Sequence, residues 1–140
     1  MARIKIDIPN SWHFTHQLSV RVTDLNYGNH LANNAILELV HEARVRFFHS
    51  LNQSELEFFG SGLIMADCGI EFKAEAFMFE NISISVAVAD IQKAGFDLVY
   101  QLKKDDNTIV ANVKTAMVFF NYENKRVQRT PQDFITHFSS

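Results

Sequence analysis

Cysteine and proline are scarce in this chain of 140 residues, which contains one cysteine and two prolines. The single cysteine, Cys68, cannot form a disulfide within the chain, and its apolar neighbours on the same predicted strand face indicate a buried, inert thiol. The N-terminus, MARIKIDIPN, lacks the apolar core of a secretory signal peptide, so we expect a cytoplasmic protein. No apolar run is long enough to cross a bilayer, and we therefore expect no integral membrane contact.

A strong excess of positive charge is also absent. The 13 basic residues are scattered and are outnumbered by 16 acidic residues, which gives a formal net charge of -3. Because phosphate binding needs clustered Lys and Arg, we expect no nucleic-acid partner. No Pro-, Gly- or Ser-rich stretch divides the chain, and 47% of its residues are hydrophobic. These features predict one domain spanning residues 1–140, with a sizeable core.

Sequence patterns for metals, nucleotides and serine hydrolysis are missing as well. His41-Glu42 begins an HExxH-like pattern, but Val45 occupies the position of the second histidine, so no metal site is predicted. The chain has neither a Gly-rich phosphate loop nor a GxSxG elbow. We therefore expect no cofactor.

Hydrophobic periodicity predicts one long helix and a series of strands. Between Asn33 and Leu51 the apolar residues recur at three- and four-residue steps, and Leu37 and Phe48 widen the apolar stripe. This pattern is typical of a helix that is buried on more than one side. Alternation of apolar and polar residues predicts strands at 14–22, 66–73, 82–89, 96–102 and 109–119.

Two short helices complete the predicted elements. Ser54 followed by Glu57 forms a capping-box pattern and predicts a helical piece over 54–59. Thr130 before Pro131 predicts the N-cap of a terminal helix. Turn-forming residues between the last strands favour an antiparallel meander. One long helix facing one curved antiparallel sheet is an α+β layer fold, and most of the 13 phenylalanines are expected in its core.

The segment 21–44 concentrates the side chains that carry chemistry. Its acid, amides and histidine come just before the predicted long helix, whose start presents free N–H donors and a positive dipole end suited to a carbonyl. Asp24 and His30 are candidate bases. Asn26 is expected on the same strand face as Asp24, because residues two apart on a strand face the same side. Asn34 is expected to be the N-cap of the helix.

The element order, a strand and a long helix followed by four strands, resembles the hotdog fold, in which a sheet of about five strands wraps a central helix. Segment 21–44 makes this resemblance more specific. It is similar to the 4-hydroxybenzoyl-CoA thioesterase-like family of acyl-CoA thioesterases, and plant acyl-carrier-protein thioesterases carry a similar motif. The family pattern joins an Asp-Leu-Asp unit, a Gly-His-Val-Asn-Asn stretch and a helical Glu-Glu-Ala-Arg. Its counterparts here are Asp24-Leu25-Asn26, Asn29-His30-Leu31-Ala32-Asn33 and His41-Glu42-Ala43-Arg44.

The resemblance implies a catalytic carboxylate at the second acid of the Asp-Leu-Asp unit, and this chain has Asn26 there. An amide can orient a water molecule but cannot take its proton. Three alternatives remain for the base: Asp24 supplies it, His30 supplies it, or a helix acid does, as in related hotdog enzymes. The helix acids are Glu38 and Glu42. We favour Asp24 acting with His30.

The activity that this resemblance implies is hydrolysis of an acyl-CoA or acyl-carrier-protein thioester to a free acid and a thiol. Backbone N–H groups near Asn33, with Asn29 or His30, would hold the carbonyl oxygen. The residues expected to contact the substrate are Tyr27, Gly28, Asn29, Asn33, Glu38, Glu42 and Met65.

Two other functions stay open. One is a non-catalytic acyl-thioester binding module, in which Asn26 marks lost chemistry. The other is a hotdog dehydratase or hydratase that acts on 3-hydroxyacyl thioesters. The resemblance also implies a homodimer or homotetramer, with sheets joined edge to edge and a second subunit completing each pocket. Pairing would remove an exposed sheet edge, which is an aggregation liability.

Overall fold

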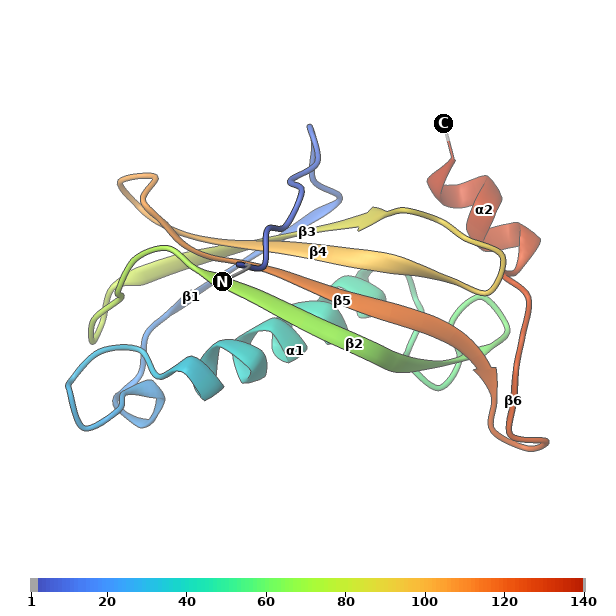
Figure 1. The fold of residues 1–140 in the computed structure, drawn as a ribbon, viewed down its shortest axis with the longest axis horizontal. Coiled ribbons are helices and arrows are strands. Elements are labelled where there is room, and N and C mark those ends of the chain that lie inside the picture. Colours follow the sequence, from blue (N-terminus) through green and yellow to red (C-terminus); the bar gives the residue numbers. More distant parts are fainter. Residues whose placement is uncertain (1–2, 140) are drawn as a thin grey trace.

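A single antiparallel sheet curves over one long helix in the computed structural model, which describes residues 3–139 (Figure 1). Across these residues, no helix has the length and apolar character needed to cross a membrane. The elements in chain order are β1 (Phe14–Ser19), η1 (Val22–Asp24, a 3-10 turn), α1 (Asn33–Ser50), β2 (Gly62–Phe72), β3 (Asn81–Ala89), β4 (Gly95–Lys104), β5 (Ile109–Asn121), β6 (Arg126–Val127) and α2 (Gln132–Phe138).

The strand order in the sheet is β1-β3-β4-β5-β2, and the short β6 pairs with β5. Every pairing is antiparallel. The expectation of a simple meander is therefore right for β3, β4 and β5 and wrong for the first two strands, which pair with β3 and β5 and form the edges of the main sheet. Alternation along a strand shows which face is buried but carries no information about its partner, so this arrangement was not predictable from periodicity.

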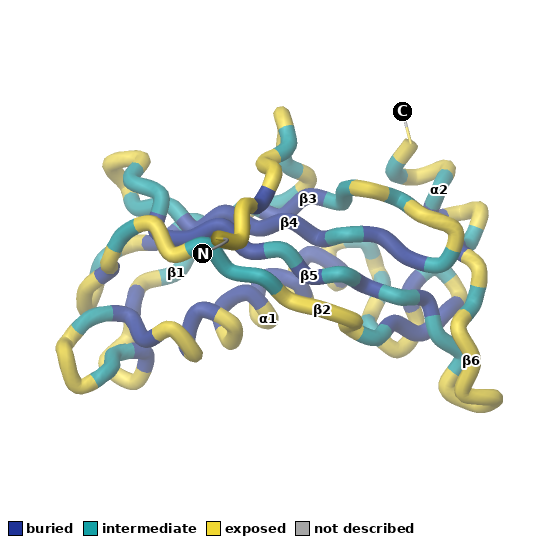
Figure 2. The backbone as a smooth tube through the Cα atoms, viewed as in Figure 1, coloured by how far each residue is buried: buried dark blue, intermediate teal, exposed yellow. Residues whose placement is uncertain are grey.

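Helix α1 follows the predicted boundaries closely because its sequence contains neither Gly nor Pro and keeps a continuous apolar stripe. Asn52, with a φ of 58°, stops it in the left-handed conformation. Phe48 is buried as expected, but Leu37 is 43% exposed because it lies on a flank that the chain itself does not cover. Figure 2 shows the buried face of α1 turned toward the sheet. The residues buried on that face are Ala35, Ile36, Leu39, Val40, Ala43, Arg44, Phe47 and Phe48.

Aromatic side chains fill the end of the core near the C-terminus of α1. The ring centroids of Phe96 and Phe134 are 4.5 Å apart, and the ring of Phe58 lies 4.4 Å from that of Phe48. Phe134 comes from α2, so the terminal helix seals this end of the domain. Most of these rings are fully buried, as expected for core residues. Both pairs are tilted, with angles of 40° and 38° between the ring planes, so neither is a face-to-face stack.

Three local expectations need correction. The first strand ends at Ser19 rather than at residue 22, because the chain turns into η1. Residues 54–59 form no helix: the Ser54 hydroxyl accepts the N–H of Glu57, as in a capping box, but the chain continues as a turn. Thr130 does not cap α2, because its hydroxyl donates instead to the carbonyl of Gln92 at 2.6 Å.

Cys68 is exposed, so the expectation of a buried thiol is wrong. The strand itself was predicted, but the face expected to be buried is not: Ala66 and Phe72 are exposed as well, because β2 is an edge strand and nothing in the chain covers this part of it. Partial desolvation still raises the pKa of the Cys68 thiol, which disfavours the reactive thiolate. The sequence pattern thus described the strand and missed its place in the sheet.

Candidate active site

A tight hairpin connects η1 to the start of α1. Its backbone closes where the N–H of Asn26 donates to the carbonyl of His30 at 2.9 Å, and the N–H of Asn29 donates back to the carbonyl of Asn26 at 3.0 Å. Asn29 adopts a φ of 65°, a left-handed conformation that Asn tolerates better than most residues. The amides of the motif therefore shape the turn that presents His30.

The side chain of Asn26 holds this hairpin together from inside. Its Oδ1 accepts the N–H of Gly28 at 2.8 Å and, more weakly, the N–H of His30 at 3.4 Å. Its Nδ2 lies 3.4 Å from Nδ1 of the His30 ring. A side chain at position 28 would bring its Cβ within 3.2 Å of both Asn26 Oδ1 and His30 Nε2, so the glycine leaves room for this contact. Asn26 consequently positions His30.

Asp24 lies apart from this contact. It ends η1, so the expectation that it shares a strand face with Asn26 is wrong. Its carboxylate is 2% exposed and accepts three hydrogen bonds from Arg21, from the backbone N–H at 2.9 Å, Nε at 3.1 Å and Nη2 at 2.9 Å. Burial disfavours the charged carboxyl, but these bonds outweigh it and hold the pKa of Asp24 below its ordinary value. The geometry therefore does not support Asp24 as the base.

The start of α1 is left without a capping side chain. Its N-cap is Ala32, in extended conformation, and no side chain in residues 3–139 caps it. Asn34 is not the N-cap that we expected, because both it and Asn33 lie within the first helical turn. Alanine is a poor N-cap, less favourable than Ser, Thr, Asp or Asn by about 1 kcal/mol. The first N–H groups of the helix therefore stay available to a ligand.

A pocket of about 290 Å³ opens at this helix start. One wall comes from the hairpin and α1, and the other comes from the connection between β2 and β3. The two walls are joined where the N–H of Leu31 donates to the carbonyl of Ala76 at 2.7 Å and where His30 bridges Phe77. The lining residues are His30, Leu31, Asn33, Ile36, Phe72, Lys73, Ala74, Glu75 and Val110. Two predicted site residues, His30 and Asn33, thus meet in one pocket.

The pocket also holds Glu75, an acid that the sequence analysis missed. Its Oε1 lies 3.9 Å from Nε2 of His30, and the two side chains are 64% and 34% exposed. Forty-five positions separate these residues, and Glu75 lies in a connection without secondary structure. No periodicity or motif marks such a position, so only the folded chain brings the acid to the histidine.

The two helix acids lie elsewhere. Positions 33, 37 and 41 follow one flank of α1, whereas Glu38 and Glu42 follow another, because helical residues four apart share a face. Glu42 pairs with Arg46, whose hydrogen bond lowers the pKa of Glu42. Both acids contribute to the electrostatic environment of Arg21, on the β1 side of the helix. Neither lines the pocket that contains His30.

Tyr27 and Met65, two expected substrate contacts, also lie outside the pocket of the single chain. Tyr27 is fully exposed at the hairpin tip beside Gly28. Met65 is 48% exposed on β2, seven positions from Phe72, a separation of about 23 Å along a strand. Within one chain, Met65 cannot reach a ligand at the start of α1.

Arg44, the last residue of the helical motif, has a structural environment that the sequence did not reveal. Its side chain is buried beneath the sheet, where Nε donates to Glu55 at 2.8 Å and Nη1 donates to the Tyr100 hydroxyl at 3.3 Å. That hydroxyl also lies 2.8 Å from the hydroxyl of Thr115. Burial raises the pKa of Tyr100. This network ties α1 to β4 and β5.

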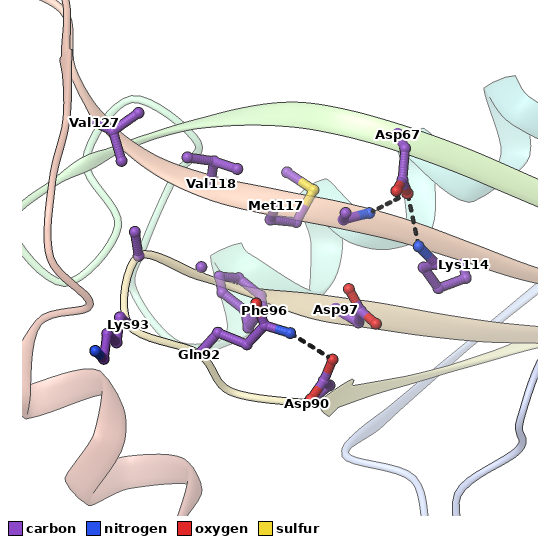
Figure 3. A pocket seen from close by; sticks show the side chains of 13 residues that line it. Asp67, Asp90, Gln92, Lys93, Phe96, Asp97, Lys114, Met117, Val118 and Val127 are labelled. Carbon is purple, nitrogen blue, oxygen red and sulfur yellow. Dashed lines mark hydrogen bonds and ion pairs between the residues drawn. The ribbon is translucent and has the colours of Figure 1, made fainter.

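A second, larger pocket of about 880 Å³ lies on the face of the sheet turned away from α1 (Figure 3). Lys114 bonds Asp67 there at 2.8 Å, across β5 and β2. Burial is the main cause of the raised pKa of Asp97, which neighbours them. This pocket contains none of the expected site residues.

Comparison with solved structures identifies the fold. Several solved structures share the fold, which confirms the predicted α+β hotdog architecture. A 1,4-dihydroxy-2-naphthoyl-CoA thioesterase from Synechocystis is 19% identical over 89% of this chain and 94% of its own, with a TM-score of 0.79. A Staphylococcus aureus protein solved in complex with CoA is 19% identical over 96% and 87%, with a TM-score of 0.80. A thioesterase superfamily protein from Jannaschia sp. CCS1 is 18% identical over 94% and 84%, with a TM-score of 0.82.

The family is established by the sequence itself. Residues 20–138 match the Thioesterase-like superfamily, and the chain belongs to it. Comparison with curated proteins gives no match. The matched span includes the hairpin, α1 and every strand from β2 onward, so the resemblance seen in segment 21–44 extends over most of the domain.

Proposed function

We propose that this protein hydrolyses an acyl-CoA thioester to a free acid and a thiol. The observation that carries the proposal is the uncapped start of α1 directly beside His30, in a pocket open to a ligand. Membership of the Thioesterase-like superfamily supports the same reaction class. The Staphylococcus aureus relative in complex with CoA supports CoA as the thiol carrier.

The proposed chemistry begins with the thioester carbonyl at the helix start. When a nucleophile attacks, negative charge develops on the carbonyl oxygen, and the uncapped N–H groups of the first helical turn, which begins at the pocket residue Asn33, are the helix donors available to it. Fixed donors of this kind contribute roughly 10²–10³ each in rate. The positive end of the helix dipole adds to this stabilisation. His30, held by Asn26, sits beside the place where the nucleophile must arrive.

We further propose that a second copy of the chain completes the site. β2 is an edge strand with exposed apolar side chains, including Met65 and Phe72, and Leu37 is exposed on the flank of α1. Pairing of two β2 edges about a twofold axis would remove a free edge and cover these side chains. Because the strands would run in opposite directions, Met65 of the partner would lie nearer to this pocket than the chain's own Met65 does.

Thiol release from a panel of acyl- and aryl-CoA thioesters tests the proposed reaction. Replacement His30→Ala should lower kcat by about 10²-fold or more, because it removes the side chain beside the reacting carbonyl. His49→Ala is the matched control, since His49 is exposed at the far end of α1 and outside the pocket.

These assays distinguish thioester hydrolysis from non-catalytic binding of an acyl thioester. Turnover that His30→Ala abolishes and His49→Ala preserves would support a thioesterase. Tight acyl-CoA binding by the wild type without release of thiol from any thioester would refute hydrolysis. That outcome would support the non-catalytic binding module, in which Asn26 only shapes the hairpin.

A further inference from the structure

We infer that Glu75 is the catalytic base of this site and supplies the carboxylate that Asn26 cannot. The inference rests on the proposed thioester hydrolysis and assigns its proton acceptor. Glu75 lies in the connection between β2 and β3, and its carboxylate faces His30 across the pocket at the start of α1. Among residues 3–139, no other acid lines this pocket.

The orientation of the Asn26 amide favours His30 as a hydrogen-bond donor, rather than a base, at the pocket side. Asn26 Oδ1 is identified as the oxygen because it accepts the N–H of Gly28 at 2.8 Å, so the group facing His30 Nδ1 is the Nδ2 donor. Nδ1 of a neutral His30 must then be the acceptor, and the ring proton is on Nε2. Nε2 points toward Glu75 as an N–H donor and has no lone pair with which to take a proton from water.

The distance between the two groups suits one shared water molecule. His30 Nε2 and Glu75 Oε1 are 3.9 Å apart, too far for a direct hydrogen bond. A water about 2.8 Å from each atom would accept the N–H of His30 and donate to the carboxylate of Glu75. Its second lone pair would remain free to attack a carbonyl carbon held at the helix start.

The proposed step balances with water as the only co-reactant. Glu75 takes a proton from the water while the oxygen forms a bond to the carbonyl carbon, and the carbonyl π electrons move to its oxygen. That oxyanion then re-forms the carbonyl, the C–S bond breaks, and the sulfur leaves with the bond electrons. The thiolate receives the proton held by Glu75, which returns the carboxylate to its starting form. The products are the acid and the thiol.

Three other acids in this part of the chain are engaged by different partners. Asp24 is bound by Arg21, and Glu42 is bound by Arg46. Glu71, nearer to Glu75 in sequence, accepts the N–H of Ile6 at 3.0 Å. Among residues 3–139, the Glu75 side chain makes no direct hydrogen bond, and its one basic neighbour within 4.0 Å is His30. Glu75 is thus free to act on a water molecule.

The test compares kcat and KM of four proteins on the acyl-CoA that the wild type hydrolyses fastest. Glu75→Gln keeps the size of the side chain and removes the base, so kcat should fall by about 10²-fold or more with little change in KM. Glu75→Asp retains a carboxylate and should recover part of this loss. Glu123→Gln, in the exposed turn between β5 and β6, is the matched control and should behave as the wild type.

The possible results of this comparison lead to different conclusions about Glu75. Wild-type activity that Glu75→Gln leaves unchanged would overturn the role of Glu75 while the proposed hydrolysis stands. A loss in Glu75→Gln that appears in KM alone would also overturn it, because it would make Glu75 a binding residue. Absence of thiol release by the wild type would refute the proposed function and this assignment together. Unchanged thermal unfolding of Glu75→Gln would show that a loss of kcat is not due to misfolding.

Discussion

Replacement of Asp24 by Ala should destabilise the fold while the remaining folded enzyme keeps its turnover. The buried carboxylate accepts the backbone N–H of Arg21, a charge-assisted bond worth about 1.5–3 kcal/mol. The Arg21 side chain is 66% exposed, so its ion pair with Asp24 adds only about 0.2–1 kcal/mol. The expected loss in the free energy of unfolding is therefore about 2–4 kcal/mol, from a total of about 5–15 kcal/mol.

Urea unfolding measures this loss directly. A change of this size should move the midpoint of unfolding by about 1–2 M. Asp24→Asn keeps one acceptor oxygen for the Arg21 backbone and removes the charge, so it should lose less stability than Asp24→Ala. Turnover is then measured without urea, under conditions in which both variants are folded. Each variant should retain most of the wild-type kcat.

The pH dependence of stability gives an independent check with a defined sign. Hydrogen bonds hold the pKa of Asp24 below its ordinary value of 3.8, so the folded protein favours the charged carboxyl. Its stabilising contribution is present above the unfolded pKa and is lost as the pH falls through the folded pKa. The stability difference between the wild type and Asp24→Asn should therefore shrink below about pH 4. A variant with unchanged stability and abolished kcat would refute this reasoning and make Asp24 the base.

Two further predictions concern the core and the edge of the sheet. Phe134→Ala should lower the free energy of unfolding by about 3–5 kcal/mol in a urea titration, because the fully buried ring joins α2 to the aromatic end of the core; a loss below about 1 kcal/mol would contradict that packing. Cys68→Lys should convert the proposed dimer to a monomer in light-scattering measurements and reduce thiol release, because two like charges would meet near the middle of paired β2 edges. A dimer of unchanged mass in this variant would argue against β2 as the interface.

The sequence predicted the secondary structure of this domain well and its pairing poorly. Helix α1 and the strands β2 to β5 follow from side-chain periodicity, which is a local property of the chain. The errors lie where a distant partner decides the outcome. The exposure of Cys68, for example, depends on β2 being an edge strand, and periodicity cannot report that position.

The candidate site shows the same difference between local features, which the sequence predicted, and contacts between distant segments, which it did not. The motif around His30 is continuous in sequence, so the histidine, the hairpin amides and the following helix start were identified before the fold was known. Asp24 was misplaced because a 3-10 turn replaced the end of a predicted strand and turned its carboxylate to Arg21. Asn26 was understood as a lost acid, and the folded hairpin shows it as the residue that orients His30.

The sequence by itself therefore determined the family, the long helix, the strands and the histidine, because each depends on residues that are neighbours along the chain. Only the tertiary structure decided which acid meets that histidine. Glu75 reaches His30 because the connection after β2 is hydrogen-bonded to the hairpin before α1, through the contact between Leu31 and Ala76. Contacts between segments so far apart depend on strand order and on the closure of the whole core, which no local pattern encodes.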